Sequence, residues 1–199
     1  MQTKGRRIAA ICIRVTLMVS ALLFARQCLA PSALQEGARL YIGRVEEGSP
    51  STERASPKSL LLKQAVVKKY ELDKDKARSI VWQVFRETSG KVFPKPEHVL
   101  AIIGIESSFN PKAQNGRHLG LMQVQEGLWG SREELLHSGT NIKKGIEILE
   151  EYYRLTGSIE GALISYNAGI GKYQRGQVPR STWRYLRKFN EELAYYSGR

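Results

Sequence analysis

The sequence predicts an all-α domain built from helices joined by short connections. Three observations lead to this prediction. After residue 59, apolar residues recur at intervals of three and four along successive segments. Gly, Pro, Ser and Asp stand between these segments, at places where helices begin and end. We find no alternation of apolar and polar residues that would predict a strand, and no internal repeat.

Two helices are expected at the start of the domain. Residues 59–70 form a short amphipathic segment, and residues 73–90 contain a longer one. Asp73 or Asp75 can cap the start of the longer helix, and Gly90 can end it. Its residues at helical spacing are Ala77, Ile80, Val81, Val84 and Phe85.

The next helix is expected within HVLAIIGIESSFNP, residues 98–111, and the residues just before it. Pro96 suits the first turn of a helix, and Glu97 interacts favourably with the positive end of the helix dipole. Asn110 precedes a proline and is therefore biased away from helical geometry. The helix should end at this asparagine or just before it.

The remaining helices lie in the second half of the chain. Residues 111–131 are rich in Gly, Asn and Gln and are expected to form a loop with a short element. A helix is then expected over 141–157. Ser158 can cap a further helix that closes at Gly169, and residues 181–196 form the last expected helix.

Residues 1–30 are expected to be a secretory signal peptide. They combine a basic start, an apolar stretch and small residues up to Ala30. The longest uncharged run is too short to span a bilayer well, and Arg14 interrupts the apolar stretch. We therefore expect an exported bacterial protein of the periplasm, with an uncleaved leader anchored in the inner membrane as the alternative. Cys12 and Cys28 both lie in this leader, so the domain should depend on its core rather than on disulfides.

Residues 31–59 are expected to be a polar N-terminal segment or linker, because their second half is rich in Ser, Pro and Gly. The folded domain would then cover residues 60–199. The whole chain has a formal net charge of +12, and without the leader 26 basic residues face 19 acidic ones. This excess predicts a polyanionic neighbour, such as a cell-wall polymer, an anionic lipid or nucleic acid. Export argues against nucleic acid.

Glu106 is the unusual residue of the expected helix near residue 100. On a helix, Val99, Ile102 and Ile103 share its face, and carboxylates rarely lie on such an apolar stripe. Loss of hydration there raises the pKa of a carboxyl group. A carboxyl that is still protonated near neutral pH can donate its proton to a glycosidic oxygen. The alternative is an ordinary exposed glutamate at a frayed helix end.

Four motifs give Glu106 a context. The chain contains, in order, ESSFNP, GLMQ, NIKKG and SYNAG, which start at residues 106, 120, 141 and 165. In this order and at this spacing they resemble the catalytic domain of the soluble lytic transglycosylases over about residues 92–190. The resemblance implies a lysozyme-like helical domain of the superfamily that contains goose-type lysozyme and the lytic transglycosylases.

The resemblance also implies roles for individual residues. Glu106 falls on the catalytic acid of the family, and Ser107 falls on the residue after it, which lines the cleft. STWRYLRKF resembles the closing helix of the family, whose tyrosine approaches the acid, and this tyrosine is Tyr185.

Four further residues are expected to bind substrate. Met122 would contact sugar with its apolar side chain, and Gln123 would form a hydrogen bond with it. Tyr166 and Asn167 would face Glu106 and hold the substrate. These residue types suit a sugar cleft, which needs apolar faces together with amides and hydroxyls that can hydrogen-bond.

The implied reaction is cleavage of the β-1,4 bond between N-acetylmuramic acid and N-acetylglucosamine, with formation of 1,6-anhydro ends. Glu106 would act first as acid and then as base on the muramoyl C6 hydroxyl. One carboxyl is then sufficient, whereas most glycoside hydrolases need two. No aspartate follows Asp75, and the glutamates that could serve as a second carboxylate include Glu126, Glu133 and Glu147.

Two other functions are weighed. One is a lysozyme-like peptidoglycan hydrolase. The other is a non-enzymatic protein that binds the cell wall or nucleic acid, because basic and aromatic residues alternate over 175–189. Neither metal nor cofactor is expected, since His98, His118 and His137 are dispersed. The expected partners are peptidoglycan glycan strands, with secretion, conjugation or other envelope machinery as candidates.

Overall fold

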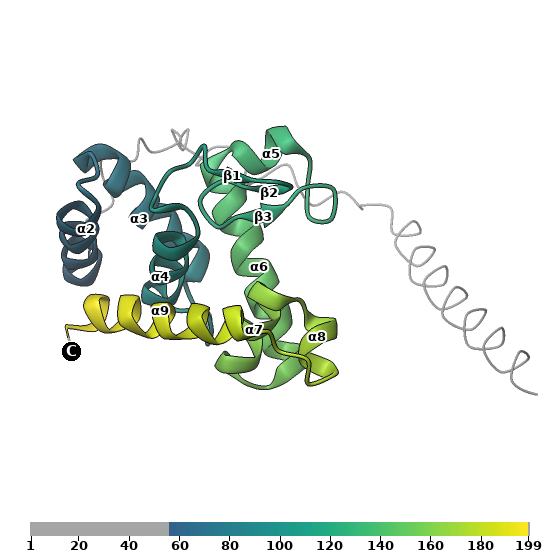
Figure 1. Ribbon diagram of the computed structural model, residues 1–199. Helices are drawn as coiled ribbons and strands as arrows, with labels where there is room; N and C mark the ends of the chain where they lie inside the picture. The colour runs from purple at the N-terminus through teal and green to yellow at the C-terminus, as the bar shows by residue number, and fades with distance from the viewer. Residues whose placement is uncertain (1–55, 199) are drawn as a thin grey trace, which may run out of the picture. The chain divides into compact units, whose positions relative to one another are not determined.

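The computed structural model describes residues 56–198. The expected signal peptide and most of the expected polar segment lie outside the described residues. Within residues 56–198 the chain forms eight helices and one small sheet (Figure 1). The helices are α2 (Pro57–Tyr70), α3 (Lys74–Thr88), α4 (Pro96–Ser107), α5 (Arg132–Leu136), α6 (Ser138–Thr156), α7 (Ile159–Ala168), α8 (Ile170–Gln174) and α9 (Arg180–Ser197). The prediction of a helical domain is confirmed.

Several helix ends follow from local sequence. The Asp73 carboxylate accepts hydrogen bonds from the backbone N–H groups of Asp75 and Lys76, which makes Asp73 the N-cap of α3. Gly157 ends α6 in the left-handed conformation, and Ser158 caps α7, both as expected. The α2 helix begins slightly before residue 60, because Ser56 accepts a hydrogen bond from the backbone N–H of Ser59.

The short element expected within residues 111–131 is a small sheet, which the sequence pattern did not predict. Residues 111–131 contain an antiparallel sheet in the order β1–β2–β3, and α5 and α8 were also not expected. Each strand is two residues long, too short to show an alternating pattern. The strands are β1 (Gln114–Asn115), β2 (His118–Leu119) and β3 (Val124–Gln125). The paired residues are Gln114 with Leu119, Asn115 with His118, His118 with Gln125, and Leu119 with Val124.

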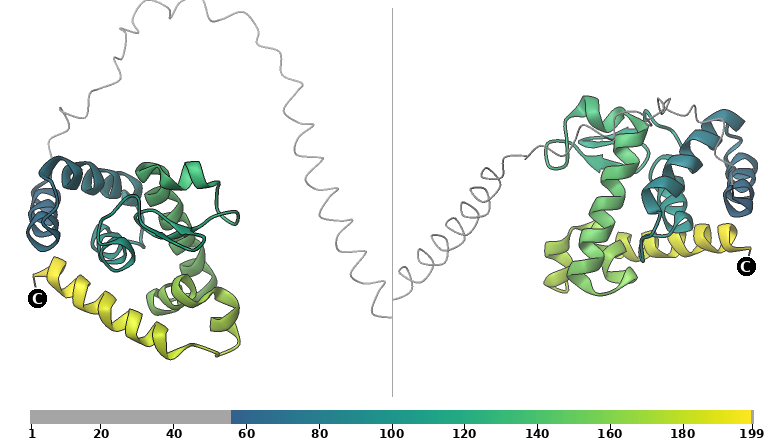
Figure 2. Two further views of the ribbon diagram at one scale, coloured as in Figure 1. Left: turned by 45° about the horizontal axis from the view of Figure 1, so that its top comes forward. Right: turned by 180° about the vertical axis from the view of Figure 1, so that it is seen from behind.

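The α4 helix forms the centre of the core. Its residues from Val99 to Gly104 are all buried, as expected for a helix that is apolar on every side. It packs against α3 and α9, and α9 also contacts α2 near its end and α7 near its start (Figures 1 and 2). The α6 helix packs against α3, α5 and α7. Because of this arrangement, α4, α7 and α9 meet near the end of α4.

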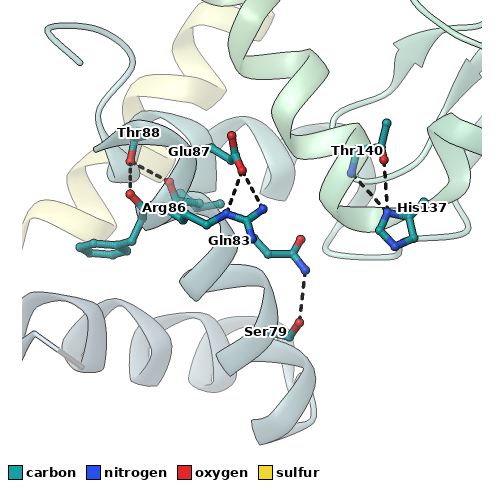
Figure 3. A network of polar contacts seen from close by, with 9 residues as sticks. Ser79, Gln83, Arg86, Glu87, Thr88, His137 and Thr140 are labelled. Atoms are coloured by element: carbon teal, nitrogen blue, oxygen red, sulfur yellow. Dashed lines mark hydrogen bonds and ion pairs between the residues drawn. The ribbon is translucent and has the colours of Figure 1, made fainter. Parts of the chain in front are cut away.

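Figure 3 shows local polar contacts within α3 and at the start of α6. Gln83 donates to the Ser79 hydroxyl at 3.5 Å, and Thr88 donates to the Val84 carbonyl at 2.7 Å. At the start of α6, Nδ1 of His137 accepts from the backbone N–H of Thr140 at 3.4 Å. This cap starts α6 before residue 141.

None of the helices in residues 56–198 is long and apolar enough to cross a bilayer.

Candidate active site

Glu106 lies in the last turn of α4, and the chain turns sharply directly after that helix. Ser108 and Phe109 both have a left-handed backbone, with φ of 49° and 61°, which is uncommon for residues other than glycine. Phe109 is buried, and its ring lies 4.7 Å from that of Tyr70 on α2. This anchored turn fixes the end of α4, and with it the position of Glu106.

The carboxyl of Glu106 is partly buried, and its pKa is raised from an ordinary value of 4.5 to about 7. The main cause is burial, which disfavours the charged form. The hydroxyl of Tyr185 acts in the opposite direction by favouring the carboxylate. This contact does not have the geometry of a full hydrogen bond, and the Tyr185 hydroxyl has no other hydrogen-bond partner within residues 56–198. Near neutral pH, both forms of Glu106 are therefore well populated.

Two tyrosines lie close to Glu106. Tyr185 on α9 is buried, and Tyr166 on α7 donates its hydroxyl to the backbone carbonyl of Met122 at 2.8 Å. Burial, followed by the charge of Glu106, raises the pKa of both phenols well above the ordinary value. Both hydroxyls therefore stay protonated and neutral, and Tyr185 can act as a donor toward the carboxylate.

The GLMQ segment is held by a residue whose role was not predicted. Asn141 is fully buried at the start of α6, and its Oδ1 accepts from the backbone N–H of Met122 at 2.8 Å. Its Nδ2 donates to the carbonyls of Leu119 and Leu135, also at 2.8 Å. Asn141 is the first residue of NIKKG, so the motif was visible in the sequence although its function was not.

The expected contact of Met122 with sugar is wrong for this structure. Its side chain is 0% exposed and packs over Gly145, the last residue of NIKKG. A Cβ at residue 145 would overlap the sulfur of Met122, so the glycine makes room for it. Met122 therefore belongs to the core, and its backbone carbonyl positions Tyr166.

Gln123 and Ser107 use part of their polar groups within the protein. The amide nitrogen of Gln123 donates to the carbonyls of Ala113 and Gly120, at 3.1 and 2.9 Å. Its Oε1 makes no hydrogen bond within residues 56–198. A substrate could therefore bind Gln123 by donating a hydrogen bond to this oxygen, because the amide nitrogen is already engaged. The Ser107 hydroxyl donates to the carbonyl of Ile103 at 3.0 Å and is partly buried beside Glu106.

Asn167 and Tyr185 both line a pocket of about 300 Å³. The Oδ1 of Asn167 accepts from the Thr182 hydroxyl at 2.8 Å, which links α7 to α9. The pocket is lined by Ile105, Asn167, Ser181, Arg184, Tyr185 and Lys188. Of these residues, only Asn167 and Tyr185 are expected from the sequence to bind substrate, while Arg184 and Lys188 belong to the basic and aromatic stretch over 175–189. The spacing of residues 181, 184, 185 and 188 on one helix face was a signal that could have added Ser181, Arg184 and Lys188.

The other glutamates considered as a second carboxylate are engaged elsewhere or lie in solvent. Glu126 pairs with Arg132 at 3.5 Å, Glu147 pairs with Lys144 at 3.0 Å, and Glu133 is exposed. In the described part of the chain, none of them is among the groups that shift the pKa of Glu106. Nor does that part bring together three or more His, Cys, Asp or Glu side chains that could hold a metal.

Known proteins resemble this chain in sequence and in fold. Residues 83–182 match the family model described as "Transglycosylase SLT domain". A solved structure of the 70-kDa soluble lytic transglycosylase in complex with bulgecin A is similar, with 22% identity and a TM-score of 0.54. The match covers 72% of this chain but only 31% of that one, and no curated protein matches. The expected lysozyme-like fold is confirmed.

Proposed function

Since this chain belongs to the transglycosylase SLT domain family, we propose that it is a peptidoglycan lytic transglycosylase with Glu106 as its catalytic acid. The observation that supports this most directly is the Glu106 carboxyl, whose pKa of about 7 results mainly from burial at the end of α4. An acid with this pKa can give up a proton and take one back near neutral pH.

In the first step, protonated Glu106 donates its proton to the glycosidic oxygen between N-acetylmuramic acid and N-acetylglucosamine. The bond from this oxygen to C1 of the muramoyl residue breaks, and positive charge develops at C1. Glu106 is left as a carboxylate. The neutral hydroxyl of Tyr185, which favours the charged form, stabilises it at this stage.

In the second step, the Glu106 carboxylate accepts the proton of the C6 hydroxyl of the same muramoyl residue. The C6 oxygen bonds to C1, which closes the 1,6-anhydro ring and restores the protonated acid. The attacking group is part of the substrate, so the step gains from proximity and requires no water.

A lysozyme-like hydrolase is the second candidate. Such an enzyme commonly uses a further carboxylate as base or nucleophile. Within residues 56–198, no second carboxylate influences the pKa of Glu106, which favours the single-residue mechanism. The sugar ends of the product distinguish the two reactions, because hydrolysis leaves reducing ends and transglycosylation leaves anhydromuramoyl ends.

The test is digestion of purified peptidoglycan by the wild-type protein and by Glu106→Gln, followed by mass analysis of the product ends. We expect anhydromuramoyl ends from the wild type and a loss of rate of roughly 10²- to 10⁴-fold for the variant. Reducing ends would contradict the reaction, and an active Glu106→Gln would contradict the residue. A protein that binds peptidoglycan without cleaving it would be a wall-binding protein.

We also propose that the enzyme acts outside the inner membrane, on the basis of the leader in residues 1–30. Envelope machinery such as a secretion or conjugation system is a candidate partner. Cell fractionation with N-terminal sequencing of the recovered protein tests the location. A mature chain beginning after Ala30 supports cleavage, and a membrane-bound chain that retains the leader supports the anchored form.

A further inference from the structure

The pocket beside Tyr185 adjoins the proposed catalytic group. Ile105, which lines it, directly precedes Glu106, and Tyr185 approaches the Glu106 carboxyl. A volume of about 300 Å³ is at the small end of ligand pockets. This space suits one group of a larger substrate whose reacting bond lies at Glu106.

Two cations of α9 line this pocket. Arg184 and Lys188 are four residues apart, so they lie on the same helix face, and both are exposed. Within residues 56–198, neither forms an ion pair. Like charges at this spacing destabilise a helix slightly. An anion bound between them would remove this repulsion.

The other polar groups of the pocket also favour an acceptor as ligand. Asn167 accepts from Thr182 through Oδ1, so its Nδ2 is the group left to bind a ligand. Arg184 and Lys188 have donors only, and the Ser181 hydroxyl can donate. A carboxylate, which only accepts, complements this set of donors.

We propose that Asn167, Ser181, Arg184 and Lys188 form a subsite for a carboxylate of the peptide carried by the glycan strand. The proposal rests on the proposed function, because the ligand is part of peptidoglycan. The sugars of the strand are neutral, and its carboxylates lie on the peptides attached to the muramoyl residues. The muramoyl residue that reacts at Glu106 brings its peptide to the neighbouring pocket. The subsite would make the enzyme selective for strands with acidic peptides.

The experiment compares short glycan fragments that carry the same synthetic peptide as the free acid or as the carboxamide. Dissociation constants are measured in a Glu106→Gln background, so that no turnover is needed. The variants are Arg184→Ala, Lys188→Ala and both together. Arg187→Ala is the matched control, since Arg187 is an exposed cation of the same helix that does not line the pocket.

We expect the parent protein to bind the acid about tenfold more tightly than the carboxamide, as two exposed cations would provide. Each single variant should lower this ratio about threefold, and the double variant should bring it close to one. Arg187→Ala should keep the parent ratio. Because these contacts are electrostatic, the ratio should also fall as salt is raised.

Two results would overturn the subsite. One is a ratio that is the same in the double variant and in the parent. The other is an Arg187→Ala variant that lowers the ratio as much as the double variant does, which would assign the preference to the general positive charge of α9 and not to the pocket. The proposed function fails separately, if the protein with Glu106 intact releases no anhydromuramoyl ends from the free-acid fragment.

Discussion

Replacing Glu106 by glutamine should stabilise the fold above neutral pH while it abolishes catalysis. Burial raises the pKa of Glu106 from 4.5 to about 7, so between these values the folded protein binds the proton more tightly than the unfolded chain. The free energy of unfolding therefore falls as pH rises through this range. A tenfold change in proton affinity corresponds to about 1.4 kcal/mol. The shift of the pKa from 4.5 to about 7 therefore lowers the unfolding free energy of the wild type by about 3 kcal/mol above pH 7.

Glutamine has nearly the same shape and no proton to lose, so Glu106→Gln escapes this cost. We expect the two proteins to have similar unfolding free energies at pH 4, and the variant to be more stable by about 3 kcal/mol at pH 8. Urea unfolding followed by circular dichroism at several pH values measures the difference. Glu133→Gln, at an exposed glutamate of α5, is the matched control and should show no such gain.

A difference between Glu106→Gln and wild type that does not change with pH would refute the reasoning. The carboxyl would then be as well hydrated in the folded protein as in the unfolded chain. An elevated pKa could not be part of the mechanism in that case. Loss of activity in the same variant would show only that the residue is needed, and not why.

Three further predictions concern the surroundings of Glu106. Tyr185→Phe removes a hydroxyl that favours the carboxylate, so the pKa of Glu106 should rise further and the alkaline limb of the kcat/KM profile should move to higher pH. At pH 6 its rate should fall by about tenfold, as expected when the carboxylate that forms during the reaction lacks one hydrogen-bond donor. Gly145→Ala places a methyl group against Met122 and should destabilise the protein by about 1–3 kcal/mol in urea unfolding. Asn141→Ala removes three buried hydrogen bonds to backbone groups, and about 3 kcal/mol or more of unfolding free energy should be lost.

Each of these three has a result that contradicts it. An alkaline limb that stays in place in Tyr185→Phe would mean that the hydroxyl does not stabilise the carboxylate. An unchanged urea midpoint in Gly145→Ala would show that Met122 can move aside without cost. Asn190→Ala, at an exposed asparagine of α9, is the control for Asn141→Ala, and an equal loss in both would remove the special role of Asn141.

Local signals in the sequence were sufficient to predict the long helices. Asp73 and Ser158 can start a helix and Gly157 can end one through contacts with residues two to four positions away, so their effect is visible in the sequence. The position of Glu106 on an apolar face is also a property of one helix. The two-residue strands and the five-residue helices α5 and α8 show no periodicity, and they could not be predicted this way.

Contacts between distant segments were the part that the sequence did not reveal. An exposed Met122 and a buried Met122 look the same in the motif GLMQ. Its burial depends on the missing side chain of Gly145, on a helix that begins well after the motif. The motif SYNAG also depends on a distant segment, because the Tyr166 hydroxyl donates to the carbonyl of Met122. Such contacts depend on how the helices pack, which spacing along the chain does not determine.

These long-range contacts explain why four short motifs together are more specific than any one of them. Asn141 and Gly145 of NIKKG hold GLMQ, and the carbonyl of Met122 in GLMQ holds Tyr166 of SYNAG. These contacts join the three motifs into one packed unit. The ESSFNP motif supplies Glu106, which lies close to Tyr166 at the edge of this unit. Through Tyr166 this unit of three motifs lies beside the single carboxyl of the fourth, whose pKa burial raises to about 7.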